Sequence, residues 1–175
     1  LQTLGNIRDK EAVDPLVKVL NEPNYRLRQS ACKSLGKLKD PRAVKPLIKC
    51  LKDENDSVKM NATESLGLIG DEKAIKPLKS LLKKEKNMRV KIVTSRALGR
   101  LGNDSGWKVA LKGIDTDNVR EKVEAIMALG DIGKVNKQIE EKIISLSKEN
   151  SPQINYAVQY TASRLRINLK KKEKK

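Results

Sequence analysis

The chain has 175 residues, with 38 Lys and Arg against 22 Asp and Glu, and its formal net charge is +16. It contains no histidine, which excludes histidine-based catalytic triads, histidine general bases and histidine metal ligands. No apolar run approaches the ~18 residues of a membrane span, the first residues show no signal-peptide pattern, and the two cysteines lack a disulfide-framework or metal spacing. We therefore expect a cytoplasmic protein with no cofactor, no metal and no membrane contact.

An internal repeat organises the sequence. A Leu-Gly pair recurs at intervals of 31, 31, 32 and 31 residues. The pairs are Leu4-Gly5, Leu35-Gly36, Leu66-Gly67, Leu98-Gly99 and Leu129-Gly130. A sixth, degenerate copy at residues 154–165 keeps the period without the pair. Regular recurrence at this length predicts an array of similar structural units.

Each repeat is predicted to contain two amphipathic helices. Residues 25–38 form a second helix of a repeat, with Leu27, Ala31, Leu35 and Leu38 as its buried stripe. Asp40 then caps a first helix over residues 41–53, with Pro41 at its first position. The apolar face of that helix holds Val44, Leu47, Ile48 and Leu51. Short polar turns that can supply caps follow the first helices at residues 21–24, 53–57, 84–87, 115–118 and 149–152.

Neither helix pair can bury its apolar face alone, so stacking of successive pairs is required to close a core. The sequence therefore predicts an all-α fold, a right-handed α-solenoid of stacked antiparallel helix pairs with a period of about 31 residues. We expect one array over residues 1–169 and a disordered basic tail over 170–175. The array would comprise a half repeat at 1–8, repeats at about 9–39, 40–70, 71–102 and 103–133, and a degenerate repeat at 134–169.

The repeat follows the pattern A-L-G-x-[LI]-G-D…A-[VI]-x-P-L, which residues 65–78 match with Ser65 in place of the first Ala. This pattern resembles HEAT repeats, specifically the short HEAT-like repeats of the phycobilisome-lyase type. The resemblance covers about residues 1–165 and implies the solenoid fold. It implies no single activity, because that family includes scaffolds, lyase subunits and enzymes.

Three series of residues recur in phase and are predicted to have structural roles. Pro15, Pro46 and Pro77 lie six residues after the expected caps, and we expect them to kink the first helices. Basic residues precede the Leu-Gly anchors, and acidic or polar residues follow them. The basic series is Arg28, Lys59, Lys91 and Lys122. The acidic or polar series is Asp9, Asp40, Asp71 and Asn103. As the resemblance implies, such positions form a ladder of charge and hydrogen-bond contacts between successive repeats.

Binding in solenoids commonly uses the concave surface that the second helices build. The candidate binding residues there are Arg26, Lys33, Lys37, Met60, Glu64, Leu68, Arg89, Arg96, Arg100, Met127, Tyr156, Tyr160 and Arg164. Arg, Met and Tyr are enriched in protein interfaces. Met60, Ile92 and Val123 occupy one column, which either packs against neighbouring helices or lines a peptide groove.

No glycine-rich phosphate loop or catalytic constellation is present. We expect a non-enzymatic scaffold that binds a protein or peptide partner, as a monomer or as part of a longer chain. One alternative is a nucleic-acid-binding module that uses the basic charge. A stripe of lysines on the first helices could serve it, or could simply be a solvated face. The stripe is Lys45, Lys49, Lys52, Lys76, Lys79, Lys83 and Lys84. A further alternative, which the resemblance raises, is a lyase or chaperone-lyase subunit.

Overall fold

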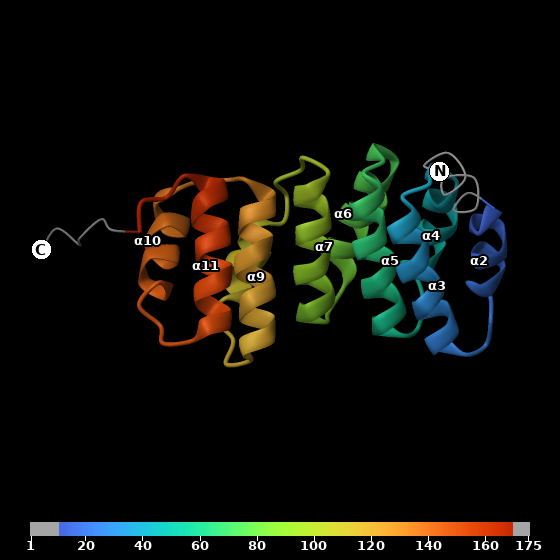
Figure 1. Cartoon of the computed structure of the whole chain (residues 1–175), viewed down its shortest axis with the longest axis horizontal. Coiled ribbons are helices and arrows are strands. Elements are labelled where there is room, and N and C mark those ends of the chain that lie inside the picture. Colours follow the sequence, from blue (N-terminus) through green and yellow to red (C-terminus); the bar gives the residue numbers. More distant parts are fainter. Residues whose placement is uncertain (1–10, 170–175) are drawn as a thin grey trace, which may run out of the picture. The chain divides into compact units, whose positions relative to one another are not determined.

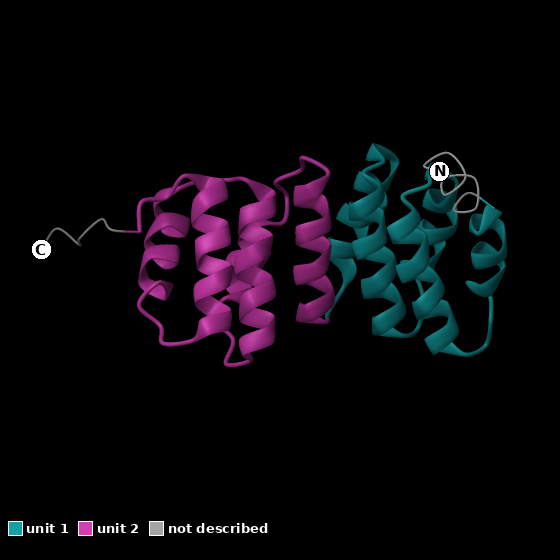
Figure 2. Ribbon diagram, in the orientation of Figure 1, with its two compact units in different colours: residues 1–86 teal, residues 87–175 magenta. Residues whose placement is uncertain are grey.

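A computed structural model describes residues 11–169, and every regular element within that range is a helix. The expected half repeat at 1–8, Asp9 of the acidic series and the basic tail at 170–175 lie outside the described residues. The chain divides into two compact units, residues 1–86 and 87–175 (Figure 2). The division falls in the turn between α6 and α7.

Both units consist of helices joined by short turns (Figure 1). Unit 1 contains α2 (Val13–Val19), α3 (Tyr25–Leu38), the 3₁₀ turn η1 (Pro41–Ala43), α4 (Val44–Cys50), α5 (Asp56–Ile69), the 3₁₀ turn η2 (Glu72–Ala74) and α6 (Ile75–Lys84). Unit 2 contains α7 (Met88–Arg100), α8 (Trp107–Gly113), α9 (Val119–Ile132), α10 (Lys137–Leu146) and α11 (Pro152–Leu165). The helix predicted over 25–38 has the bounds of α3.

The second helices of each unit lie side by side in one layer. In unit 1, α3 packs on α5, and in unit 2, α9 packs between α7 and α11 (Figure 1). First helices cover the other side of these layers, with α2 on α3 and α4 on α5 in unit 1 and with α8 on α9 in unit 2. The leucines of the repeated Leu-Gly pairs, Leu35, Leu66, Leu98 and Leu129, are fully buried. Their period recurs because each must fill the space between one helix pair and the next.

The polar turns supply helix caps, as the sequence predicts. Asn24, Asn55 and Asn87 each accept a hydrogen bond from the backbone N–H two residues later, at the starts of α3, α5 and α7. Asn118 and Ser151 accept from the N–H three residues later, at the starts of α9 and α11. These bonds satisfy amide groups that have no partner inside the helix.

The recurrent prolines do not lie in the interiors of the first helices, so the basis of the predicted kink is wrong. Pro15, Pro46 and Pro77 are each the third residue of an α-helix, in α2, α4 and α6. The first four N–H groups of a helix have no intrahelical acceptor, so a proline there sacrifices no bond. The helix predicted over 41–53 is instead η1 followed by α4, and the switch from 3₁₀ to α geometry precedes Pro46.

The predicted buried stripe of α3 is also wrong at its N-terminal end. Ala31 and Leu35 are buried, but Leu27 is 47% exposed. Arg28 is buried there instead. Its guanidinium bonds to backbone carbonyls of the preceding turn and to a carboxylate of the next repeat. Because of these contacts, Arg28 faces inward at the start of α3 in place of Leu27.

Candidate functional site

Arg28 joins two successive repeats of unit 1 through its whole guanidinium group. Its Nε and Nη2 donate to the two carboxylate oxygens of Asp53 at 2.8 and 2.9 Å. Its Nη1 donates to the carbonyl oxygens of Glu22 and Pro23 at 2.9 and 2.8 Å. The hydrogen bonds from Arg28 hold the pKa of the Asp53 carboxyl below its usual value. This two-pronged contact fixes the turn after α4 against the start of α3.

Lys59 and Lys122 belong to the same basic series, and each makes the equivalent contact with an acidic residue of the following repeat. Lys59 lies 2.7 Å from Glu85, and Lys122 lies 3.5 Å from Glu149. Lys91 is half-buried, and its side chain has no ion pair within residues 11–169. The acidic partners Asp53, Glu85 and Glu149 lie in the turns after first helices. A recurring acidic residue in those turns is the signal that could have identified them.

The expected acidic series has a different, local role. Asp40 and Asp71 accept hydrogen bonds from the backbone N–H two residues later and cap η1 and η2. Asn103 accepts in the same way from the N–H of Ser105. The ladder contacts of Arg28, Lys59 and Lys122 are therefore made with carboxylates in the turns. Asp40, Asp71 and Asn103 instead accept backbone hydrogen bonds just after the second helices.

The largest cluster of predicted binding residues lies on α7, α9 and α11 of unit 2, around the carboxylate of Asp131. This side chain is 4% exposed. Arg96 donates from Nε to Asp131 Oδ2 at 2.8 Å, and Arg100 Nε lies 3.3 Å from the same oxygen. Tyr160 donates its hydroxyl to Oδ1, and Arg164 Nε lies 3.7 Å from Oδ1. The sequence predicted these four partners as binding residues, whereas Asp131, which shares a repeat column with Arg100 and Arg164, was not among them.

The electrostatics of this cluster stabilise the charged form of Asp131. Burial by itself raises the pKa of this carboxyl. Hydrogen bonds from Tyr160 and Arg96, together with the charges of Arg96 and Arg100, outweigh burial and set the pKa below its usual value. Burial and the bond to Asp131 raise the pKa of Tyr160, so its hydroxyl remains a donor at neutral pH.

Two glycines allow the three helices to approach closely enough to build the cluster. A Cβ on Gly99 of α7 would lie 2.6 Å from the backbone N of Ile132 and 2.7 Å from the carbonyl carbon of Asp131. A Cβ on Gly130 of α9 would lie 3.0 Å from Oγ1 of Thr161 on α11. The glycine of the repeated Leu-Gly pair therefore sets the spacing between second helices and brings side chains of three helices to one carboxylate.

Apolar side chains lie beside the arginines on the same helices. Tyr156 of α11 is 67% exposed, and Met127 of α9 is half-buried. Ile92 is 1% exposed and Val123 is half-buried against the core, so these two members of the predicted column pack against neighbouring helices. The second-helix face of unit 2 is hereafter the surface formed by Arg96, Arg100, Met127, Tyr156, Tyr160 and Arg164. Arg89, at the start of α7, lies 3.7 Å from Glu121.

The corresponding residues of unit 1 do not form such a cluster. Arg26, Lys33 and Lys37 lie on α3, where Arg26 and Lys37 are exposed and the guanidinium of Arg26 lies over the ring of Tyr25 at 5.9 Å. On α5, Glu64 and Leu68 are exposed and Met60 is half-buried. Leu68 occupies the repeat position of Asp131, so unit 1 lacks the central carboxylate.

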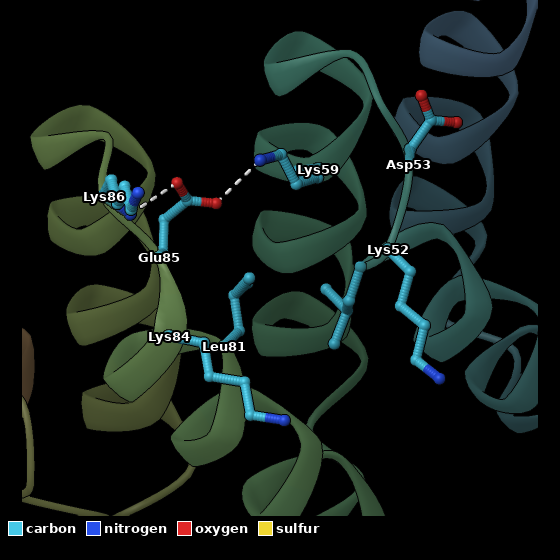
Figure 3. Close-up of a pocket in the computed structure, with 8 residues that line it drawn as sticks. Lys52, Asp53, Lys59, Leu81, Lys84, Glu85 and Lys86 are labelled. Carbon is cyan, nitrogen blue, oxygen red and sulfur yellow. Dashed lines mark hydrogen bonds and ion pairs between the residues drawn. The ribbon is translucent and has the colours of Figure 1, made fainter.

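A hollow of about 340 Å³ lies in unit 1, lined by residues of the turn after α4, of the end of α6 and the turn that follows it, and by Lys59 (Figure 3). The carboxylate of Glu85 lies between Lys59 and the backbone N–H of Lys86. Arg28 holds Asp53, the other acidic residue of the lining. Both acids are thus engaged in ladder contacts. Residues 11–169 contain no group of three or more Cys, Asp and Glu side chains that could hold a metal ion, and none of their helices is long and apolar enough to cross a membrane.

Comparison with known proteins identifies the repeat. The family model of HEAT repeats matches residues 1–66, 16–99 and 44–129, which together cover well over half of the chain. No match was found among curated proteins.

Solved structures share the fold at low sequence identity. An engineered protein is similar with a TM-score of 0.60 and 19% identity, over 91% of this chain and 81% of its own. Computationally designed armadillo repeat proteins for modular peptide recognition are similar with a TM-score of 0.52 and 18% identity, over 86% and 80%. The complex of CpcE and CpcF of phycocyanin lyase from Nostoc is similar with a TM-score of 0.50 and 20% identity, over 91% and 85%. The chain belongs to the HEAT-repeat family and is an all-α solenoid of stacked helix pairs.

Proposed function

We propose that the protein is a non-enzymatic scaffold that binds a protein or peptide partner on the second-helix face of unit 2. The observation that carries this proposal is the cluster of partly exposed arginines around Asp131, with Met127 and the exposed ring of Tyr156 on the same helices. Arg, Tyr and Met are the residues that protein interfaces favour over the rest of the surface. The similarity to designed repeat proteins for peptide recognition supports the same type of partner.

Rigid positioning of these side chains also supports binding. Arg96 and Tyr160 are tied to Asp131, and Asp131 is held on a helix packed on both sides. Side chains that are ordered before binding lose less conformational entropy when a partner arrives. An exposed aromatic ring on the same helix as Arg164 is a suitable anchor for a peptide.

A random peptide display library, selected on the whole chain, tests this function. Peptides that bind are measured again on Tyr156→Ala and on the matched control Tyr25→Ala, which removes an exposed tyrosine of unit 1. We expect Tyr156→Ala to weaken binding at least ~10-fold, as for an interface anchor, and Tyr25→Ala to leave it unchanged. The proposal is wrong if no peptide is selected, or if both variants bind as the native chain does.

One observation favours a second candidate function, nucleic-acid binding on the first helices of unit 1. Neither α4 nor α6 contains an acidic residue. The expected lysine stripe, formed by Lys45, Lys49, Lys52, Lys76, Lys79, Lys83 and Lys84, lies on these helices and the turns that follow them. A surface of this kind can neutralise phosphates and release counterions, so its binding would depend steeply on salt. It carries no aromatic side chain for base stacking, which is why we place this candidate second.

A further inference from the structure

The cluster around Asp131 contains more positive charge than its own carboxylates compensate. Arg96, Arg100 and Arg164 surround Asp131, and the one other carboxylate in contact within residues 11–169 is Glu124, 3.0 Å from Arg96 Nη1. Three guanidinium groups against two carboxylates leave one positive charge. An approaching group with a single negative charge would balance the cluster.

The donors that remain available belong to Arg100 and Arg164. Both arginines approach Asp131 through Nε, and Arg164 Nε also donates to the carbonyl of Gly130 at 3.0 Å. Within residues 11–169 no acceptor is hydrogen-bonded to the terminal Nη atoms of either side chain. The side chains are 23% and 50% exposed, so both arginines are partly accessible to solvent.

Neighbouring groups also hold the guanidinium of Arg164 in place. The guanidinium of Arg164 lies over the ring of Tyr160 at 5.6 Å, and the same ring carries the hydroxyl that donates to Asp131. Because both arginines contact Asp131 through Nε, the Nη donors of both side chains remain available near the same carboxylate. Paired guanidinium donors of this kind match the two oxygens of a carboxylate.

We propose that the Nη groups of Arg100 and Arg164 form a recognition site for one acidic side chain, an Asp or Glu, of a bound peptide. This inference rests on the proposed function and specifies its partner as an acidic peptide. A carboxylate fits better than a phosphate group, because the cluster lacks one negative charge and a phosphate carries about −1.5 to −2 at neutral pH. The exposed Tyr156 on α11 would contact an apolar residue of the same peptide.

Matched peptides test the inference. Each display-selected peptide that contains Asp or Glu is synthesised with that residue, with Asn or Gln in its place, and with phosphoserine in its place. The three forms are titrated against the native chain, Arg100→Gln, Arg164→Gln and Arg164→Lys. Arg120→Gln, which removes an exposed arginine of α9, is the control. Thermal unfolding of each variant checks that it is folded.

We expect the acidic form to bind about 10-fold more tightly than the amide form to the native chain and to Arg120→Gln. The preference should fall to about 2-fold or less in Arg100→Gln and in Arg164→Gln. Arg164→Lys should retain part of it, because the charge remains and the fork is lost. If one of these variants does not fold, the other two decide the result.

The outcomes separate this inference from the proposed function. Peptides that bind without preferring an acid would overturn the acidic site and leave the scaffold function standing. A preference that persists in the arginine-to-glutamine variants, or stronger binding of the phosphoserine form, would also overturn it. Absence of any peptide binding would reject the scaffold function itself.

Discussion

Asp131 shows at the scale of one residue how a buried charge can organise a surface. Its carboxylate accepts hydrogen bonds from Arg96 and Tyr160, and Arg100 and Arg164 lie within 3.7 Å of it. The sequence places an aspartate on α9 but gives no reason to expect it to be buried, because charged residues rarely are. Contacts from two other helices make its burial favourable, and these contacts exist only in the folded chain.

Asp131→Asn should destabilise the protein by about 3 kcal/mol, because it leaves partly buried guanidinium groups without their counter-charge. Urea unfolding followed by circular dichroism measures the change. Asp115→Asn is the matched control, since Asp115 pairs with Lys142 at 2.6 Å but its side chain is 64% exposed. That variant should change stability by no more than ~0.5 kcal/mol. Equal effects of the two substitutions would contradict the role given to Asp131.

The pKa of Asp131 predicts the direction of a pH effect. The folded-state pKa lies below the usual value, so the unfolded chain binds more protons as the pH falls below about 4. The stabilisation from Asp131 is therefore complete above that pH and is lost as the pH falls through the folded-state pKa. The stability difference between the native chain and Asp131→Asn should shrink as the pH falls below about 4 and the folded-state carboxyl becomes protonated. A constant difference across this range would be the contrary result.

Thr63 offers a residue-scale test in which the substitution should stabilise the protein. Its Oγ1 is buried and has no hydrogen-bond partner within residues 11–169, whereas Oγ1 of the buried Thr161 donates to the carbonyl of Ile126 at 2.7 Å. Thr63→Val removes an unsatisfied polar group and should stabilise the protein by about 1 kcal/mol. Thr161→Val removes a satisfied one and should destabilise it by about the same amount. Denaturant midpoints of the two variants should shift in opposite directions.

At the scale of elements, the period of the sequence determines where the helices and their caps lie. The close approach of neighbouring second helices at their glycines determines how they pack. The bounds of α3 follow from its apolar spacing and from Asn24, all of which are local in the sequence. The geometry at Pro46 was predicted incorrectly, because a 3₁₀ turn precedes the α-helix and moves the proline into its first turn. Local pattern does not distinguish a 3₁₀ start from an α-helical one.

Gly99→Ala should test the packing of α7 on α9. The new Cβ would meet backbone atoms of Asp131 and Ile132, which cannot move aside as a flexible side chain would. We expect destabilisation of about 2 kcal/mol together with weaker peptide binding, because the shift reaches Asp131. Gly70→Ala is the control: it has φ +81° and open space around it, so it should cost about 1 kcal/mol through backbone strain alone and leave peptide binding unchanged. Normal binding by Gly99→Ala would argue against this coupling.

For the whole molecule, the net charge is +16, and it is not balanced within every helix. In the described part of unit 1, α4 and α6 carry lysines without acidic neighbours on the same helix. In unit 2, many charges of the second helices are paired with carboxylates. A surplus concentrated on one face is more effective for attracting a polyanion than the same charge spread evenly.

Salt titration of binding to a single-stranded homopolymer tests this whole-molecule property. If the lysine surface binds nucleic acid, the association constant should fall ~10³-fold between about 50 and 200 mM salt. Replacement of Lys45, Lys76 and Lys83 by Gln should reduce the slope by about 2, whereas Lys108→Gln on α8 of unit 2 should leave it nearly unchanged. The absence of measurable binding at about 50 mM salt would reject the nucleic-acid candidate.

The sequence by itself determined the repeat, the all-helical solenoid, the helix caps and the pool of side chains on the second helices. These properties depend on spacing along the chain and on residues within one turn of each other. Tertiary structure decided which of those side chains act together. Two sets of contacts bring together residues of different repeats. One joins Asp131 to Arg96, Arg100, Tyr160 and Arg164, and the other joins Arg28 to Asp53. The length of each side chain and the close approach of the helices at Gly99 and Gly130 decide which residues meet. The sequence period does not specify these distances, because they separate residues of different repeats in space.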